Sequence, residues 1–350
     1  ADADAVVRRP VGTLRHEQER GHGYRSSVMA GASIELAQRL LGRPCSVERP
    51  ITVDQTNVSV VVDESVVVKW LQPPVPSPHP GVEMIRHLAE VGFDDMPDFV
   101  GADERDGVVH AVVTTFLPGA RDGWDWYVDD VQAWLDGEKE MSSVTSSARR
   151  MGSITGRLHR ALADLQPDLV NLAGVADRAM EDLQLTRAHL ADVGWLDPAV
   201  VAAALEPLRD ASLVSAHRIH GDLHAGQFLR SGDVMLVTDF DGNPLQDVLG
   251  RATSQSPLRD VASMLQSIAH VGSVVVKRRR PERATDVARF TDEAVRVALD
   301  TYRAVHEVDA QVLLAMRVAQ ELHEYAYSIH HLPHWRYVAD DALPALLGIT

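Results

Sequence analysis

The sequence predicts an α+β fold, in which a small β-rich half is followed by a large, mainly helical half. Alternating valines over Val58–Val62 and a second run over residues 66–68, separated by a polar turn, are typical of a β-hairpin. From Trp124 onward, amphipathic helical spacing dominates. The chain has 350 residues, 45% of them hydrophobic, which suits a globular protein of about two domains.

The β-rich half is expected to contain helices, strands and one stiff connection. Lys69 lies near the end of the second hairpin strand. The proline-rich run 73–80 is expected to be the stiff connection, because neither a helix nor a central strand accommodates it. Helices are expected over residues 33–41 and 81–91, and strands over residues 58–62, 66–70 and 108–117.

The second half is mainly helical with one interruption. Its helices are expected near residues 146–164, 174–191, 198–210, 258–271, 283–305 and 312–331. The interruption, 219–245, contains two short strands, 228–230 and 234–238, joined by a Ser-Gly-Asp turn. Since a hairpin brings its two open ends together, residues just before it and just after it are expected to be neighbours in space.

Polar side chains with oxygen atoms lie at both open ends of this hairpin. Asp222 and Gln227 precede it, and Asp239 follows it. Two carboxylates and an amide oxygen beside a glycine-containing turn suit Mg²⁺ with phosphates attached. A carboxylate that is not occupied by metal can accept a proton from a hydroxyl nucleophile. A β-hairpin with aspartates in its turns would explain either carboxylate alone, but not the whole set.

The segment His220-Gly221-Asp222-Leu223-His224, followed by Gln227 and then Asp239-Phe240-Asp241, resembles the catalytic core of the eukaryotic-like kinases. It is most similar to the aminoglycoside phosphotransferase and maltokinase group, which implies a bilobal protein-kinase-like fold that uses ATP and Mg²⁺. The resemblance implies that Asp222 is the base and that Gln227 and Asp239 are metal ligands, with Gln227 in place of the common asparagine. It also implies that Asp260 braces the catalytic loop. The role of Asp241 stays open among a second metal ligand, a sugar contact and a solvated side chain.

The same resemblance implies that the β-rich half holds the nucleotide. Lys69 takes the position of the lysine that pairs with the α- and β-phosphates, the alternative being an ordinary surface lysine. Its acidic partner is expected on the next helix, where Glu83 is preferred over Glu90. The adenine is expected against the strand that ends near Thr115 and Leu117, through backbone donors and acceptors.

An acceptor site is expected on the last long helix and its exit. Polar groups and an aromatic platform there would suit a sugar, and the carboxylates would suit its ammonium group, although such carboxylates are often only a solvated stripe. His224 of the catalytic loop is assigned to the same site. The expected acceptor residues on the helix and its exit are Gln320, Glu321, Glu324, Tyr325 and Trp335.

This terminal block resembles the acceptor-site signature of actinobacterial glucosamine kinases, a resemblance that covers nearly the whole chain. It implies an ATP-dependent kinase that converts D-glucosamine to glucosamine 6-phosphate. It also implies an N-terminal cap over residues 1–45, a nucleotide-binding lobe over 46–118 and a catalytic lobe over 119–350. Maltokinase and aminoglycoside phosphotransferase activities are the alternatives among enzymes. A catalytically inactive, nucleotide-binding regulator is the alternative of another class.

The charge of the chain limits its partners. The formal net charge is −16, which disfavours nucleic acid and anionic membrane as partners and favours small polar or cationic substrates. The single cysteine, Cys45, is expected to be a small buried hydrophobe. The first residues lack the apolar core of a signal peptide and no run is long enough to span a bilayer, so a cytoplasmic location is expected. The oligomeric state does not follow from the sequence.

Overall fold

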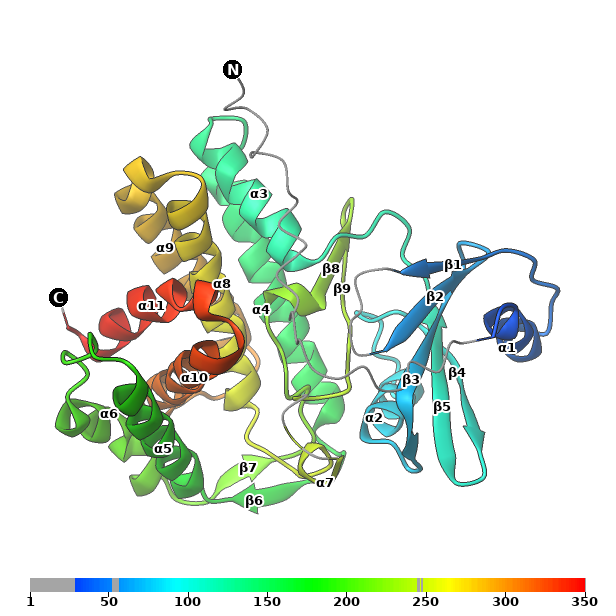
Figure 1. The fold of residues 1–350 in the computed structure, drawn as a ribbon, viewed down its shortest axis with the longest axis horizontal. Coiled ribbons are helices and arrows are strands. Elements are labelled where there is room, and N and C mark those ends of the chain that lie inside the picture. Colours follow the sequence, from blue (N-terminus) through cyan, green and yellow to red (C-terminus); the bar gives the residue numbers. More distant parts are fainter. Residues whose placement is uncertain (1–28, 52–56, 244–245, 247, 350) are drawn as a thin grey trace.

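The computed structural model describes residues 29–51, 57–243, 246 and 248–349, and it divides into two lobes (Figure 1). The smaller lobe is built on a five-stranded antiparallel sheet in the order β1-β2-β3-β5-β4. Two helices, α1 (Ala32–Leu41) and α2 (Pro80–Glu90), accompany this sheet. The strands are β1 (Glu48–Ile51), β2 (Val58–Val62), β3 (Val66–Pro76), β4 (Phe99–Arg105) and β5 (Val108–Thr115).

Successive residues of a strand point to opposite sides of the sheet, so one strand can contribute to a core on each face. On β5, Ala111 and Val113 pack in one core with Leu36 of α1. The intervening Val112 packs in the other core with Leu88 of α2. The fold of the small lobe therefore follows from the valine-rich alternation that predicted it.

Helix α1 and Cys45, which the sequence analysis assigned to an N-terminal cap over 1–45, share a core with the sheet. Cys45 is buried, as expected. Residues 1–28 of the predicted cap lie outside the described part of the chain. The division at residue 45, like that at residue 118, therefore stays a prediction.

The expectation for the proline-rich run was partly wrong, because β3 continues through it as far as Pro76. The pairing of β3 with β5 breaks between Trp70 and Val75 and then resumes at Val75 and Pro76. Prolines 73 and 74 lie in this break, where no ladder hydrogen bond requires the N–H group that proline lacks. Pro80 then opens α2, and the ring of His79 accepts hydrogen bonds from the first backbone N–H groups of that helix.

The larger lobe is mainly helical, with a two-stranded sheet and the hairpin β8–β9 (Figure 1). The hairpin, β8 (Phe228–Ser231) and β9 (Val234–Val237), forms where the sequence predicted it. The small sheet consists of β6 (Asp168–Val170) and β7 (Val214–Ala216). The helices are α3 (Gly123–Leu135), α4 (Met141–Leu162), α5 (Ala173–His189), α6 (Pro198–Asp210), α7 (Val248–Arg251), α8 (Leu258–Arg278), α9 (Ala284–Arg303), α10 (Ala310–His331) and α11 (Tyr337–Leu347).

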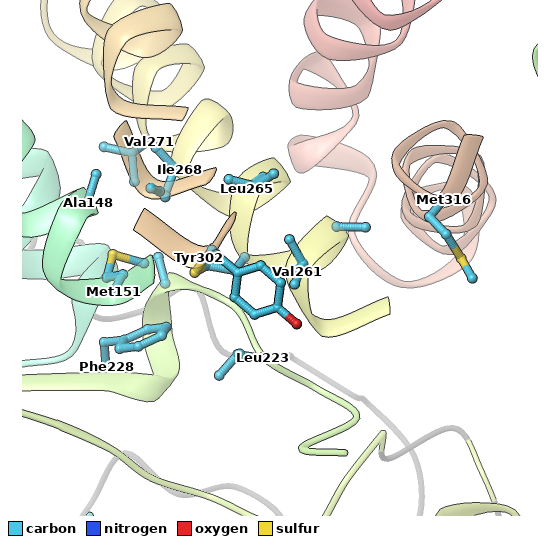
Figure 2. Close-up of a cluster of buried hydrophobic side chains, with 14 of the residues drawn as sticks. Ala148, Met151, Leu223, Phe228, Val261, Leu265, Ile268, Val271, Tyr302 and Met316 are labelled. Carbon is cyan, nitrogen blue, oxygen red and sulfur yellow. The ribbon is translucent and has the colours of Figure 1, made fainter. Parts of the chain in front are cut away.

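Helix α8 lies at the centre of this lobe, in contact with α3, α4, α9, α10 and α11. Figure 2 shows its residues Val261, Leu265 and Ile268 within the buried hydrophobic cluster. Leu223, from the loop before the hairpin, and Phe228, at the start of β8, belong to the same cluster and are fully buried. The hydrophobic core thus anchors the loop that carries the predicted catalytic residues.

The α+β fold predicted from the sequence is confirmed, whereas several individual elements were missed. Most expected helices form within a few residues of their expected ends, and α8 extends farther than expected. Other elements were not recognised in the sequence. These missed elements are β1, β4, α3, β6, β7, α7 and α11.

The contact between α4 and α9 requires a glycine at position 152. A Cβ atom there would lie 2.2 Å from the backbone oxygen of Ala298 on α9. We expect Gly152→Ala to lower the free energy of unfolding by about 1–3 kcal/mol, because the two backbones would have to separate. The matched control is Gly174→Ala on α5, where an added Cβ meets nothing within 4 Å. We expect this control to be neutral or to gain about 0.5–1 kcal/mol. Urea unfolding measures both variants, and equal effects would contradict the close approach.

Candidate active site

The hairpin β8–β9 brings the loop before it against the segment after it. The backbone N–H of Thr238 donates to the carbonyl of Gln227 at 2.9 Å. The ring Nε2 of His220 lies 2.9 Å from the carbonyl oxygen of Thr238. A carbonyl only accepts, so Nε2 carries the proton, and Nδ1 is left to accept from the backbone N–H of Asp222 at 3.3 Å. Both open ends of the hairpin are thus joined, as the sequence predicted.

Asp260, at the start of α8, holds the beginning of this loop. Its carboxylate is 1% exposed and accepts from the backbone N–H groups of His220, at 2.8 Å, and Gly221, at 2.9 Å. The ring Nε2 of His159, on α4, lies 3.2 Å from the same carboxylate. Gly221 has a φ of 81°, a conformation that glycine adopts without strain. Burial alone would raise the pKa of Asp260, but the hydrogen bond and the nearby ring of His159 hold it below its ordinary value.

The end of the loop is held by α8 and α3. Ser267 of α8 accepts a hydrogen bond from the backbone N–H of Ala225 at 2.8 Å. A Cβ on Gly123, the first residue of α3, would lie 1.9 Å from the carbonyl oxygen of Ala225. A Cβ on Gly226 would lie 2.7 Å from the indole of Trp124. Glycines at these two positions therefore allow Trp124 to lie against the catalytic loop.

Asp222, the predicted base, lies on this loop with a side chain that is 34% exposed. Desolvation in these surroundings raises its pKa to about 7. The ring of His224 faces this carboxylate, with Nε2 3.9 Å from Asp222 Oδ2. Burial lowers the pKa of His224 to about 4, so this ring is neutral at physiological pH. Asp222 therefore has a proton affinity suited to exchange with a hydroxyl group near neutrality.

Lys69 reaches across from β3 to the segment after β9. Its ammonium donates to Asp239 at 2.7 Å and to Asp241 at 2.8 Å. Although burial lowers the pKa of Lys69, these two carboxylates hold it above the ordinary value. Lys69 thus connects the two lobes through paired acids, and it is only 22% exposed. The alternative that Lys69 is an ordinary surface lysine does not fit this position.

The expected pairing of Lys69 with Glu83 was wrong. Glu83 lies instead 3.9 Å from the buried guanidinium of Arg218. The reason is the approach of α2, which presents its first turn to the segment after β9. A Cβ on Gly81 would lie 2.8 Å from Asp241 Oδ1, so the helix N-terminus faces Asp241. Asp241, whose role the sequence left open, is therefore an ionic partner of Lys69.

The predicted metal ligands lie at the same end of the hairpin. Gln227 is 8% exposed, with its side-chain amide 3.4 Å from the ring of His224. Asp239 has a φ of 66°, a left-handed conformation that is uncommon for a residue other than glycine. The ammonium of Lys69 already rests between two carboxylate oxygens, which shows that these oxygens can surround a cation. The donor types present, carboxylate and amide oxygen, fit Mg²⁺.

The two predicted nucleotide contacts at the end of β5, Thr115 and Leu117, differ in the hydrogen bonds that they already make. The backbone N–H of Thr115 donates to the carbonyl of Asp98 at 2.9 Å, and its hydroxyl accepts from Asp98 at 2.8 Å. Both of these groups of Thr115 are therefore engaged in the small lobe. Leu117 lies beyond the strand, where its carbonyl accepts from Ala120 at 3.3 Å. The assignment of Leu117 to the nucleotide stays a prediction.

The acceptor residues predicted on α10 separate into buried and accessible groups. Glu321 is fully buried, and its Oε2 lies 2.9 Å from Nε2 of His270 on α8. Glu324 is 30% exposed, with its Oε2 at 3.4 Å from Nδ1 of the same ring. Gln320 donates from its amide to Oε1 of Glu324 at 3.0 Å. Glu324 and Gln320 are thus placed to meet a ligand, whereas Glu321 lies behind them.

Tyr325 does not belong to the accessible group, so the expectation that it contacts the acceptor was wrong. Its side chain is fully buried. Its hydroxyl donates to Asp340 of α11, and its ring lies beneath the guanidinium of Arg336. Tyr325 follows Glu324 directly on the helix, and this one-residue step turns its side chain towards the core.

Trp335 forms an aromatic wall together with a residue that the sequence analysis did not select. Its ring is edge-on to Trp124, with centroids 5.7 Å apart, and Trp124 lies 6.0 Å from the ring of His224. The wall therefore connects the exit of α10 to the catalytic loop. Other supporting residues were also missed, because the local sequence does not show which polar side chains of a helix will be buried against distant partners. They are His159, Ser267 and His270.

Comparison with known proteins identifies the family. The family model described as the phosphotransferase enzyme family matches residues 48–290. The chain belongs to the phosphotransferase enzyme family. A relative from Streptacidiphilus jiangxiensis named glucosamine kinase is 39% identical over 328 residues, covering 87% of this chain and 74% of the relative. Another glucosamine kinase, from Mycolicibacterium smegmatis, is 35% identical over 331 residues, covering 86% of this chain and 79% of the relative.

A solved structure gives the same assignment. A glucosamine kinase in complex with glucosamine, ADP and inorganic phosphate has a TM-score of 0.81 and 33% identity, covering 92% of this chain and 84% of that chain. The predicted family resemblance, the kinase-like fold and the expectation of an enzyme are therefore confirmed for this phosphotransferase. Among its described helices, none combines the length and the apolar character needed to cross a membrane.

The buried contacts of Asp260 predict how much its carboxylate contributes to the stability of this phosphotransferase. We expect Asp260→Asn to lower the free energy of unfolding by about 3 kcal/mol at neutral pH, because the amide places a donor against backbone donors. Since the folded-state pKa is lowered, the contribution of the wild-type carboxylate is complete above its ordinary pKa of about 4 and is lost as the pH falls through the lower folded value. The difference between wild type and variant in urea unfolding should therefore shrink below about pH 4. A difference that is independent of pH would contradict the assigned contacts.

Proposed function

We propose that this phosphotransferase transfers the γ-phosphoryl group of ATP to glucosamine and forms glucosamine 6-phosphate. The observation that carries the proposal is the partly exposed carboxylate of Glu324 on the side of α10 that faces the catalytic loop. Glu324 and His224 interact electrostatically across this space. An ammonium group of the acceptor would find there a carboxylate partner close to the proposed base. The names of the relatives and the glucosamine bound in the solved kinase support the same substrate.

In this proposal Asp222 orients the acceptor hydroxyl and accepts its proton. Its pKa of about 7 allows the carboxylate to be ionised in part of the enzyme at neutral pH and to hold a proton once transferred. The bracing by Asp260 and Ser267 keeps the loop in one conformation, so little ordering is required when the acceptor binds. Phosphoryl transfer depends mostly on such positioning and on charge stabilisation.

The nucleotide is assigned to the small-lobe side of the same loop. Lys69 would pair with the α- and β-phosphates, since it is the cation already placed beside Asp239. Gln227 and Asp239 would hold Mg²⁺, which when bound neutralises charge on the phosphate oxygens. Leu117 would offer backbone groups to the adenine.

The acceptor is assigned to the surface between α10 and the catalytic loop. Glu324 would bind the ammonium of glucosamine, with Gln320 and His224 bonding its hydroxyl groups. Trp335 and Trp124 would cover the apolar face of the sugar ring. Glu321 and Tyr325 are too deeply buried to contact the sugar, so they act through their neighbours.

The substrate can be tested with a panel of acceptors. We expect ADP release from ATP and Mg²⁺ to depend on glucosamine, with glucose turned over less efficiently because it lacks the ammonium group. Turnover of maltose or kanamycin without turnover of glucosamine would replace the proposed substrate. No turnover with any of these acceptors, or with other sugars, would favour a nucleotide-binding regulator.

The role of Asp222 can be tested by removing its basicity. We expect Asp222→Asn to lower kcat by about 10²–10⁴-fold, while binding of ADP, measured by calorimetry, stays near that of the wild type. Near-normal turnover of the variant would contradict the proposed role. Loss of both turnover and ADP binding would indicate that the loop had rearranged instead.

The pH dependence gives a separate test of the base. The protonated form of Asp222 cannot accept the hydroxyl proton, so kcat/KM should rise with increasing pH through a midpoint near 7. The measurement is kcat/KM for glucose, an acceptor without an ionisable group, at saturating ATP and Mg²⁺. A flat profile between pH 5 and 8 would argue against this carboxylate as the base.

A further inference from the structure

Helix α8 contributes a buried histidine to the side of the molecule assigned to the acceptor. His270 is 2% exposed, and each of its ring nitrogens faces a different carboxylate of α10. Nε2 lies 2.9 Å from Glu321 Oε2, and Nδ1 lies 3.4 Å from Glu324 Oε2. A ring that faces two carboxylates in this way can donate from both nitrogens only in its protonated form.

The charges around the ring favour that protonated form. Although burial opposes it, Glu321 and Glu324 raise the pKa of His270 to about 9. Burial and Glu321 hold the pKa of Glu324 above its ordinary value, and His270 opposes this rise. Without the imidazolium, two neighbouring carboxylates in a desolvated place would not both stay ionised. His270 is therefore the cation that favours the charged form of Glu324.

The position of Glu324 is also set by these contacts. Its Oε2 faces His270 and its Oε1 accepts from Gln320 at 3.0 Å, so both oxygens are held. Ser267, one helical turn before His270 on α8, binds the catalytic loop at Ala225. One helix thus positions both the loop that carries the proposed base and the carboxylate assigned to the acceptor.

We propose that His270 is a positioning residue for acceptor specificity, which holds the carboxylate of Glu324 in place and supplies it with a cationic partner, so that it can bind the ammonium group of an amino sugar. This inference rests on the proposed glucosamine kinase activity and adds a residue that does not itself touch the sugar. Its effect should be on the binding of a cationic acceptor and not on the phosphoryl transfer step. The KM for a neutral sugar should not depend on His270.

The three side chains also have the composition of a metal site, since their ligand atoms lie within 4.8 Å of one another. A bound divalent cation would have to displace the ring proton, which is held by two carboxylates. The ion-paired arrangement therefore predicts that the purified enzyme carries no stoichiometric metal at His270.

The test compares steady-state kinetics of His270→Gln with the wild type, using glucosamine and glucose as acceptors. We expect KM for glucosamine to rise by about tenfold or more, with kcat, KM for ATP and KM for glucose changing less than about twofold. A purely structural defect would instead affect both acceptors alike. Because the variant leaves Glu321 buried with a weaker partner, the double variant His270→Gln, Glu321→Gln provides a neutral pair in case the single variant does not fold.

The matched control is His323→Asn on α10, the helix that carries Glu321 and Glu324. His323 also faces a carboxylate, Asp182 at 3.2 Å, but it is 37% exposed and takes no part in the site. This control should leave all kinetic constants unchanged.

The outcomes separate the two proposals. If the wild type does not phosphorylate glucosamine, the proposed function fails, and the inference fails with it. If the wild type does so and both His270 variants keep its KM for glucosamine, only the inference fails. One metal ion per chain, measured by elemental analysis and lost in His270→Gln, would also overturn the inference.

Discussion

The site depends on one buried carboxylate, that of Asp260 at the beginning of α8. Its two oxygens accept from consecutive backbone N–H groups of the catalytic loop and face the ring of His159. A loop of this kind has no regular backbone partners of its own, so its conformation must be imposed from outside. Because Asp260 belongs to the central helix of the larger lobe, the loop takes its position from the hydrophobic core. The buried side chains of Leu223 and Phe228 secure it in the same core (Figure 2).

The same helix organises the rest of the catalytic face. Asp260, Ser267 and His270 of α8 reach the start of the loop, its end and the acidic pair of α10, respectively. Each contact is polar and nearly excluded from water, so each is strong when formed and costly when broken. The relative placement of the proposed base and the proposed acceptor carboxylate is thus set by one rigid element of the larger lobe.

The site could be predicted from the sequence where the reactive side chains lie close to one another along the chain. The hairpin and its flanking acids were predictable, because the loop, turn and strands are adjacent in the chain. The partner of Lys69 was not, since the choice between Glu83 and Asp241 depends on how α2 approaches the other lobe. The burial of Tyr325 and the role of His270 depend on how α8, α10 and α11 pack, which periodicity does not specify. The extension of β3 through its prolines was missed because a register break, and not the residue type alone, made it possible.

The contact of Lys69 with Asp239 and Asp241 has a consequence for which ligands the space between the lobes prefers. An ammonium that leaves both acids while partly buried needs another anion, since an unpaired charge there is costly. A ligand that brings negative charge offers such a partner. A free cation instead competes for the two acids and leaves the ammonium of Lys69 without an ionic partner. Charge balance around Lys69 therefore favours ligands that carry both signs of charge, such as a metal–nucleotide complex, over bare ions.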